Sequence, residues 1–108
     1  NLKKNFDNLE IVEWGKVPKF DMIVNATSVG LNEKDQIKLN YESIGPSKFF
    51  YDVIYNPKQT FFLKKAKKFG NITENGKMMF IYQAHQSFAI WHKVLPDIDD
   101  ETINLLDK

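Results

Sequence analysis

The run FFYDVIY at residues 49 to 55 constrains the fold more than any other part of the chain. Its aromatic and β-branched residues are typical of a strand, and Asn56-Pro57 ends it because proline lacks the N–H that a strand needs. Thr60 then offers a good N-cap, and Gly70 a helix end, for a helix of about ten residues. Its apolar stripe consists of Phe62, Leu63, Ala66 and Phe69. The sequence therefore predicts a strand that leads directly into an amphipathic helix.

Three other segments have the composition of strands. Residues 22 to 24 (MIV) are continuously apolar, as in a parallel strand that is covered on both faces. Residues 9 to 14 (LEIVEW) are β-branched and aromatic, and a short strand is expected around Ile72-Thr73. Residues 31 to 47 are polar and are expected to be irregular, with a turn at Gly45-Pro46.

Further helices are predicted towards both ends of the chain. Leu2 and Phe6 have the spacing of a helix face, and Asp99 or Asp100 caps a last short helix. Between them a long helix ends before Pro96, and its residues at helical spacing are Met78, Ile81, Tyr82, His85, Phe88, Ala89 and Trp91. We expect the core to include Met78, Met79, Phe88 and Trp91, with His85 as a core or interface histidine.

Strands that alternate with helices of this size predict an α/β fold with a parallel sheet, and we expect residues 1–108 to form a single unit. The 43% hydrophobic content suffices for a packed core, and the net charge of +1 disfavours nucleic acid or an anionic membrane as partner. The chain has no cysteine, so we expect no disulfide and a cytoplasmic location. No apolar run approaches the roughly 18 residues of a membrane span, and His85 and His92 lack partners at metal-ligand spacing.

Three polar loops are expected to share one edge of the sheet. They are NATSVG at residues 25 to 30, YNP at 55 to 57 and NG at 75 to 76, and each follows a predicted strand. In open parallel sheets, ligands bind beyond the carboxyl ends of the strands, because loop amides and helix N-termini converge there. This edge is therefore the candidate binding site.

The same three loops resemble motifs of the shikimate dehydrogenase family. DMIVNATSVGL at residues 21 to 31 is similar to a family strand that ends in Asn-Ala-Thr-Ser. YDVIYNPKQTFFLKKAKKFG at 51 to 70 is similar to the Tyr-Asp-x-x-Tyr-x-Pro-x-x-Thr segment and its helix. NGKMMFIYQAHQSFAIWHKVLPD at 75 to 97 resembles Asn-Gly-x-x-Met, followed by Tyr-Gln-Ala and Phe-x-x-Trp. The three motifs occur in the family's order and cover well over half of the chain.

The resemblance implies a Rossmann-like doubly wound parallel sheet and the reduction of 3-dehydroshikimate to shikimate with NADPH. It implies that Tyr55 and Gln83 bind the substrate, and that the backbone of Val53 and Gly76 lines the nicotinamide. The cofactor-side loop would include Asn25, Thr27 and Ser28. The chemistry is suitable, because a tyrosine hydroxyl donates to a carboxylate and a glutamine amide both donates and accepts around a hydroxylated ring. A glycine also allows a flat ring to approach its backbone closely.

Other parts of the family pattern have no counterpart here. The family's catalytic Lys and Asp match nothing in this chain, and no GxGxxG turn occurs, so NADP rests on the resemblance alone. We expect a truncated fold that is the carboxyl-terminal part of the NADP-binding domain, without the first βαβ unit and the substrate domain and with a helical carboxyl terminus. The first residue is not Met, which fits a start within a longer protein. In the strand order 3-2-1-4-5-6, residues 9 to 14 and 22 to 24 would be strands three and four, with the two strands between them missing. We expect such a chain to be marginally stable or self-associating, and inactive alone.

The residues by themselves leave other interpretations open. Spacing alone favours an aromatic strand residue packed against a helix for Tyr55 and an exposed helix residue for Gln83. The interpretation of Gly76 as only a turn glycine is also open. The lysines from 64 to 68 are interpreted as a solvated helix face rather than a phosphate site. For the chain as a whole, the alternative to part of an oxidoreductase is a non-catalytic Rossmann-like binding or interaction module.

Overall fold

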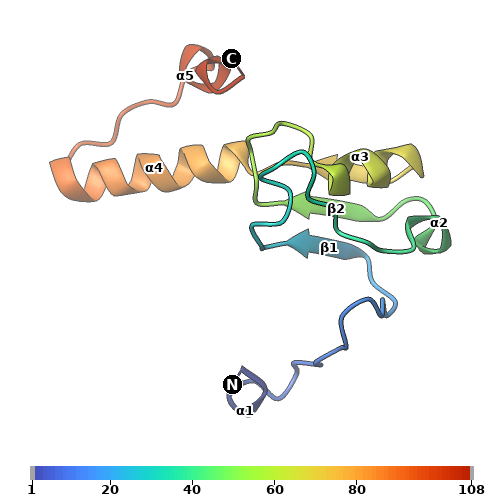
Figure 1. The fold of residues 1–108 in the computed structure, drawn as a ribbon. Coiled ribbons are helices and arrows are strands. Elements are labelled where there is room, and N and C mark those ends of the chain that lie inside the picture. Colours follow the sequence, from blue (N-terminus) through green and yellow to red (C-terminus); the bar gives the residue numbers. More distant parts are fainter. Residues whose placement is uncertain (1, 108) are drawn as a thin grey trace.

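A parallel sheet of three strands lies at the centre of the fold (Figure 1). The computed structural model describes residues 2–107. The strands β1 (Met22–Asn25), β2 (Phe49–Asp52) and β3 (Ile72–Glu74) are hydrogen-bonded in the order β1-β2-β3. In this register Asn25 is paired with Asp52. The predicted α/β class with a parallel sheet is confirmed.

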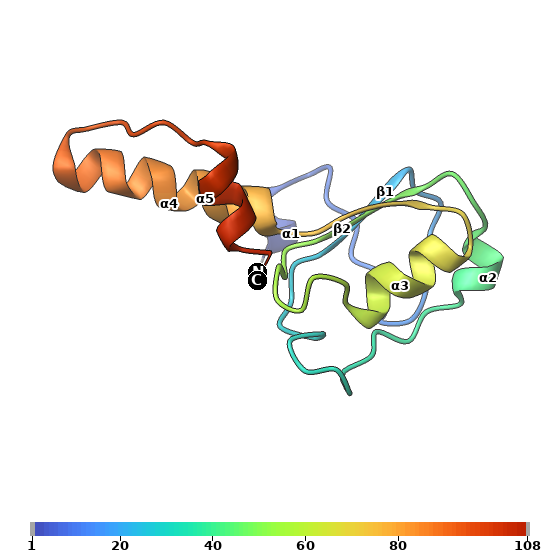
Figure 2. The ribbon, with the colours of Figure 1, turned by 90° about the horizontal axis from the view of Figure 1, so that it is seen from above.

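Helix α3 (Phe61–Lys68) packs against one face of the sheet and supplies much of the core (Figure 2). Thr60 caps it as predicted, because its side chain accepts a hydrogen bond from the N–H of Leu63. The helix ends one residue earlier than expected, with Phe69 as the C-cap, and Gly70 follows with a φ of +83° that favours glycine. The buried core side chains are Ile37, Tyr41, Phe50, Phe62, Leu63 and Ala66.

Part of this core comes from a segment that the sequence interpretation treated as irregular. Helix α2 (Tyr41–Ile44) is a single turn capped by Asn40. The Tyr41 ring stacks on Phe50 with ring centroids 6.3 Å apart, and its hydroxyl donates to the Ile37 carbonyl at 2.6 Å. The expectation of irregular structure throughout residues 31 to 47 was therefore wrong. The scattered apolar residues of this polar segment follow no helical spacing long enough to predict a helix.

Strand β2 ends at Asp52, earlier than the predicted strand at residues 49 to 55. The Asp52 carboxylate accepts a hydrogen bond from the N–H of Ile54 at 3.0 Å, and this side chain replaces a strand partner for that N–H. Val53 still donates to the Asn25 carbonyl at 3.1 Å. Tyr55 therefore lies in the loop beyond the strand.

The predicted strand at residues 9 to 14 is not present. These residues form no ladder with any other described residue, and the side chains of Ile11 and Trp14 are 67% and 74% exposed. A strand is stable only where a neighbour accepts and donates its backbone hydrogen bonds. The segment instead faces β1 across an open hollow, and the short helix α1 (Leu2–Asn5) precedes it.

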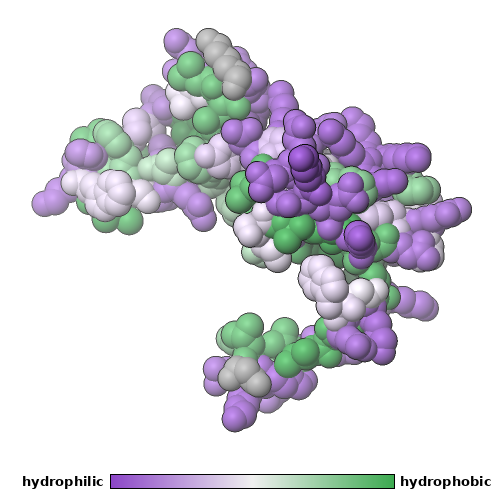
Figure 3. Space-filling model, viewed as in Figure 1, coloured by the Kyte–Doolittle hydropathy of each residue, from purple (hydrophilic) through white to green (hydrophobic). Residues whose placement is uncertain are grey.

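Helix α4 (Lys77–His92) extends away from the sheet, and α5 (Asp100–Leu105) turns back towards it (Figures 1 and 2). Ile81 is the buried residue of α4 among those described, and apolar side chains lie on its surface near the far end (Figure 3). The expectation that Phe88 and Trp91 belong to the core was wrong, since they are 42% and 77% exposed. The predicted cap at Asp99 is confirmed by its bond from the Thr102 N–H. Within residues 2–107, no helix is both long and apolar enough to span a membrane.

Candidate functional site

The loops that follow β1 and β2 line an open hollow of about 490 Å³ at the carboxyl edge of the sheet. It is lined by Thr27, Ser28, Leu31, Val53, Ile54, Tyr55 and Asn56. Four of the seven residues singled out from the sequence therefore lie together. The volume falls within the range of small-molecule sites, about 300–1,000 Å³.

Gly76 lies directly against the end of β2. A Cβ atom on Gly76 would be 1.9 Å from the carbonyl oxygen of Val53, and the Gly76 N–H donates to the Ile54 carbonyl at 3.1 Å. Its φ of −83° is open to any residue, so lack of space, and not backbone conformation, requires glycine here. The packing of Gly76 on Val53 is thus one physical reason for the glycine, and the predicted approach of a nicotinamide ring to its backbone stays a prediction. The two positions predicted to line the nicotinamide are nevertheless in contact.

Tyr55 connects the hollow to the first turns of α4. Its ring stacks on Phe80 with ring centroids 4.5 Å apart and planes 28° apart. Gln83 follows Phe80 by three residues, so the two are neighbours on one face of the helix. Gln83 itself is exposed and does not line the hollow. The structure therefore brings Tyr55 towards the face of α4 that carries Gln83 without joining the two side chains.

Asn25 and Thr27 are held by hydrogen bonds inside the protein. Asn25 is 4% exposed, and its Oδ1 accepts from the Thr27 N–H at 3.1 Å and the Thr27 hydroxyl at 2.6 Å. Its Nδ2 donates to the Val29 carbonyl at 3.0 Å and to Asp52 Oδ1 at 3.1 Å. The Asn25 side chain thus shapes the loop. Thr27 and Ser28 are exposed and line the hollow.

The sequence interpretation missed the part that Asp52 plays in this region. The Asp52 side chain is fully buried, and its Oδ2 accepts from the Thr60 hydroxyl at 2.6 Å. A carboxylate buried in an apolar strand requires several donors, because burial without partners is costly. The single acidic residue within FFYDVIY was the signal that could have identified it.

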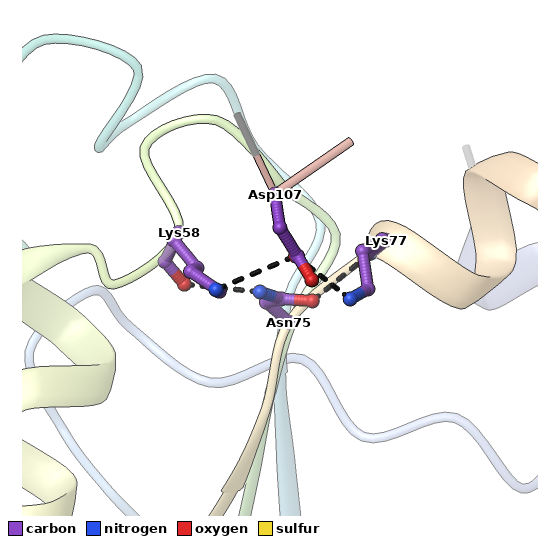
Figure 4. A network of polar contacts seen from close by, with 4 residues as sticks. All are labelled: Lys58, Asn75, Lys77 and Asp107. Atoms are coloured by element: carbon purple, nitrogen blue, oxygen red, sulfur yellow. Dashed lines mark hydrogen bonds and ion pairs between the residues drawn. The ribbon is translucent and has the colours of Figure 1, made fainter. Parts of the chain in front are cut away.

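Residues 105–107 lie over the same edge, where Asp107 contacts two lysines (Figure 4). The Asp107 carboxylate lies 2.8 Å from Lys77 Nζ at the start of α4 and 3.4 Å from Lys58 Nζ after β2. The hydrogen bond from Lys77, with a smaller effect of Lys58, lowers the pKa of Asp107 below its usual value. Asn75 supports the cluster, because it donates to the Lys58 carbonyl at 3.0 Å. Residues 105–107 and Tyr55 line a smaller hollow between them.

His85 and the lysines from 64 to 68 do not line the hollow. His85 lies with Nε2 2.6 Å from the Pro96 carbonyl oxygen, which ties α4 to the segment after it. Among the lysines from 64 to 68, Lys65 is partly buried and the others are exposed, as expected for a solvated face. No group of three or more His, Asp or Glu side chains within residues 2–107 is placed to hold a metal ion.

Comparison with known proteins gives relatives in both sequence and structure, although no family model matches the chain. A shikimate dehydrogenase (NADP(+)) from Pelagibacter ubique is 64% identical over 106 residues, which are 98% of this chain and 40% of that protein. A crystal structure of a shikimate dehydrogenase in complex with NADP+ is 38% identical with a TM-score of 0.69, over 80% of this chain and 30% of that one. The ligand-free 5-ketofructose reductase of a Gluconobacter strain is 31% identical with a TM-score of 0.64, over 80% of this chain and 31% of that one.

The chain spans less than half of the length of each of these proteins. Within the part that it spans, the sequence and the parallel sheet agree with shikimate dehydrogenases. The resemblance predicted from the three loop motifs is confirmed, and the chain corresponds to a segment of the shikimate dehydrogenase family.

Proposed function

We propose that this chain forms one wall of the active site of an NADP-dependent shikimate dehydrogenase. The reaction transfers a hydride between the nicotinamide and the carbon that carries the oxygen in 3-dehydroshikimate or shikimate, while a proton joins or leaves that oxygen. The observation that supports the proposal is the hollow that gathers Thr27, Ser28, Val53 and Tyr55, in a chain 64% identical to a shikimate dehydrogenase (NADP(+)).

The residues of the hollow suit the nicotinamide end of the cofactor. Gly76 has no side chain and packs directly against the Val53 carbonyl, which supports a backbone surface that a flat ring can approach closely. A hollow of about 490 Å³ is large enough for the reacting ring and part of a substrate. When bound, NADPH supplies the hydride, and the wall of the site sets its distance and orientation. The sequence offers no Gly-rich turn for the cofactor's phosphates.

Tyr55 and Gln83 are the substrate-binding residues of the proposal. The Tyr55 hydroxyl donates a hydrogen bond to the substrate carboxylate, and its ring is oriented by the stacking on Phe80. The Gln83 amide binds ring hydroxyls as donor and acceptor, one turn further along α4. No residue of this chain is assigned to the proton transfer. We also propose the cytoplasm as the location and residues 1–108 as one unit.

The test is steady-state kinetics of the enzyme that carries this sequence, followed by the formation of NADPH from shikimate and NADP+. We expect Tyr55→Phe and Gln83→Ala each to lower kcat/KM for shikimate. The expected loss of transition-state binding free energy is about 1 to 3 kcal/mol for each variant. The matched controls are Tyr82→Phe and Gln86→Ala, which change the same residue types on exposed positions of α4. Unchanged kinetics in both site variants contradict the assignment of Tyr55 and Gln83, and an inactive wild type contradicts the activity.

A second candidate is the reduction of another hydroxylated ketone. The similarity in fold and sequence to a 5-ketofructose reductase supports it. The two substrates differ in the carboxylate, which only shikimate carries. Tyr55→Phe should therefore impair the turnover of shikimate and leave that of 5-ketofructose nearly unchanged. Binding of both substrates without turnover would instead favour a non-catalytic binding module.

A further inference from the structure

We propose that Asn25 and Asp52 form a buried positioning pair that sets the shape of the hollow and thereby the place of the reacting ring. The pair joins the last residues of β1 and β2, which face each other in the sheet register. The inference rests on the proposed function for what the hollow binds. The geometry of the pair stands on its own.

Asp52 is fully buried, and three donors converge on its carboxylate. Asn25 Nδ2 donates to Oδ1 at 3.1 Å, the Ile54 N–H donates to Oδ1 at 3.0 Å, and the Thr60 hydroxyl donates to Oδ2 at 2.6 Å. The Ile54 bond fixes the chain between Val53 and Tyr55. The Thr60 bond fixes the residue that caps α3. One side chain therefore sets one side of the hollow and the start of the helix behind it.

Asn25 acts in the same way on the opposite side. Its carbonyl oxygen accepts from the Thr27 N–H and hydroxyl, and its second N–H bond goes to the Val29 carbonyl at 3.0 Å. Thr27 and Ile54 both line the hollow. The pair thus holds one lining residue on each side, and every donor and acceptor of the Asn25 amide is used.

Stability alone does not account for this arrangement. A buried hydrogen-bonded pair adds little net free energy compared with well-packed apolar groups, but its bonds are directional. Hydride transfer depends on distance and orientation, and a displacement of about 1 Å lowers the rate by about 100-fold. The pair therefore holds the loops that line the hollow in fixed positions relative to β1 and β2. Fixed loops in turn fix the distance between the nicotinamide and the substrate.

The test uses an exchange of the two side chains in the enzyme that carries this sequence. Asn25→Asp places a second carboxylate oxygen where the amide now faces Asp52, so the two sides repel each other. We expect kcat for shikimate oxidation to fall by about 100-fold, and the primary deuterium isotope effect on kcat to be larger than in the wild type. Asn25→Asp combined with Asp52→Asn restores one amide facing one carboxylate, and should recover at least about tenfold.

The matched control is Ile37→Ala, a cavity variant in the core that does not line the hollow. It should lower the unfolding temperature while leaving kcat and the isotope effect as in the wild type. Wild-type kcat in Asn25→Asp overturns the proposal. So does a double variant that is no better than Asn25→Asp, or a loss of kcat in Ile37→Ala equal to that in Asn25→Asp.

A second measurement depends neither on turnover nor on Asn25→Asp, which places two carboxylates against each other. Asp52→Asn keeps the shape of the side chain, and its effect is followed by the amide proton signals of the protein. We expect the signals of Ile54 and Thr27 to shift and that of Gly45, which is remote from the pair, to stay. Unmoved Ile54 and Thr27 signals overturn the pair. A wild type without shikimate oxidation contradicts the proposed function only, and the amide signals then decide on the pair.

Discussion

Two regions of the molecule are rich in apolar residues but differ in what covers them. The body, formed by the sheet with α2 and α3, buries its aromatic side chains, as the fully buried Phe50 shows. The arm, formed by α4 and the residues after it, leaves Ile90 and Trp91 about three-quarters exposed, at 75% and 77%. Apolar spacing of 3.6 residues predicts a helix in both regions. It does not predict what the helix packs against.

The candidate site follows the same division. The hollow, Val53 and the Asn25–Asp52 pair belong to the body, where hydrogen bonds and packing fix each side chain. Gln83 belongs to the arm, and among residues 2–107 no side chain forms a hydrogen bond with it. Binding sites are most precise where rigid elements support them. We therefore expect the body to set the geometry of the hollow and the arm to contribute Gln83 through the stacking of Phe80 on Tyr55.

The largest expected effect is a difference in stability between core and arm aromatic residues. Phe50→Ala should lower the free energy of unfolding by about 3 to 5 kcal/mol, because it leaves a cavity beneath α3. Trp91→Ala should change it by no more than about 0.5 kcal/mol, since the side chain is exposed. Urea unfolding of both variants measures the contrast. An equal loss in Trp91→Ala would show that the arm is covered in solution, and dilution would reveal whether a second copy covers it.

A smaller but still large effect is expected at the junction of the two regions. Gly76→Ala forces a Cβ into the Val53 carbonyl, so the end of β2 and the start of α4 must separate. We expect a loss of about 1 to 3 kcal/mol in the free energy of unfolding. Gly45→Ala is the control, because no atom lies within 4 Å of a Cβ there and only its φ of +79° is unfavourable. A smaller loss at Gly76 than at Gly45 would contradict the close contact.

The third prediction compares a tyrosine of the body with one of the arm. Burial, with a contribution from the charge of Asp52, raises the pKa of Tyr41 from 10.0 to about 12. The unfolded chain therefore loses this proton first. The stability that the neutral Tyr41 provides is complete below pH 10 and is lost as the pH rises towards 12.

Tyr41→Phe should remove that part of the alkaline decline and cost about 1 kcal/mol at neutral pH, through the lost bond to the Ile37 carbonyl. Tyr82→Phe, on an exposed position of α4, should change neither quantity. The measurement is the free energy of unfolding against pH for the three proteins. Identical alkaline slopes in the wild type and Tyr41→Phe would contradict the burial of this hydroxyl.

The features that were predictable from the sequence are those with short-range causes. The Thr60 cap, the helix after it and the strand around Phe50 follow from neighbouring residues, and so do the loops that carry Thr27 and Tyr55. The false strand at residues 9 to 14 has suitable residues, but a strand also depends on a partner elsewhere in the chain. The role of Asp52 depends on Asn25, which lies 27 residues away. The reason for Gly76 likewise depends on Val53, which only the folded chain brings into contact.

The smallest expected effect concerns the ion pairs of Asp107, which attach the carboxyl-terminal part of the arm to the body. Asp107 belongs to the arm, and Lys58 follows β2 in the body, so their cluster with Lys77 closes the chain over Tyr55 (Figure 4). Exposed ion pairs contribute little to stability, so the titration of Asp107 is a more sensitive probe than unfolding. The pKa of Asp107 is lowered in the folded protein. The small stability that its ionised carboxylate provides is therefore present above the ordinary carboxyl range, and it is lost as the pH falls through the pKa of the folded state. Followed by the carboxyl carbon signal, Lys77→Gln should raise the midpoint more than Lys58→Gln, because Lys77 Nζ is closer, at 2.8 Å against 3.4 Å. A midpoint that neither variant moves would mean that the arm is not held to the body by this cluster.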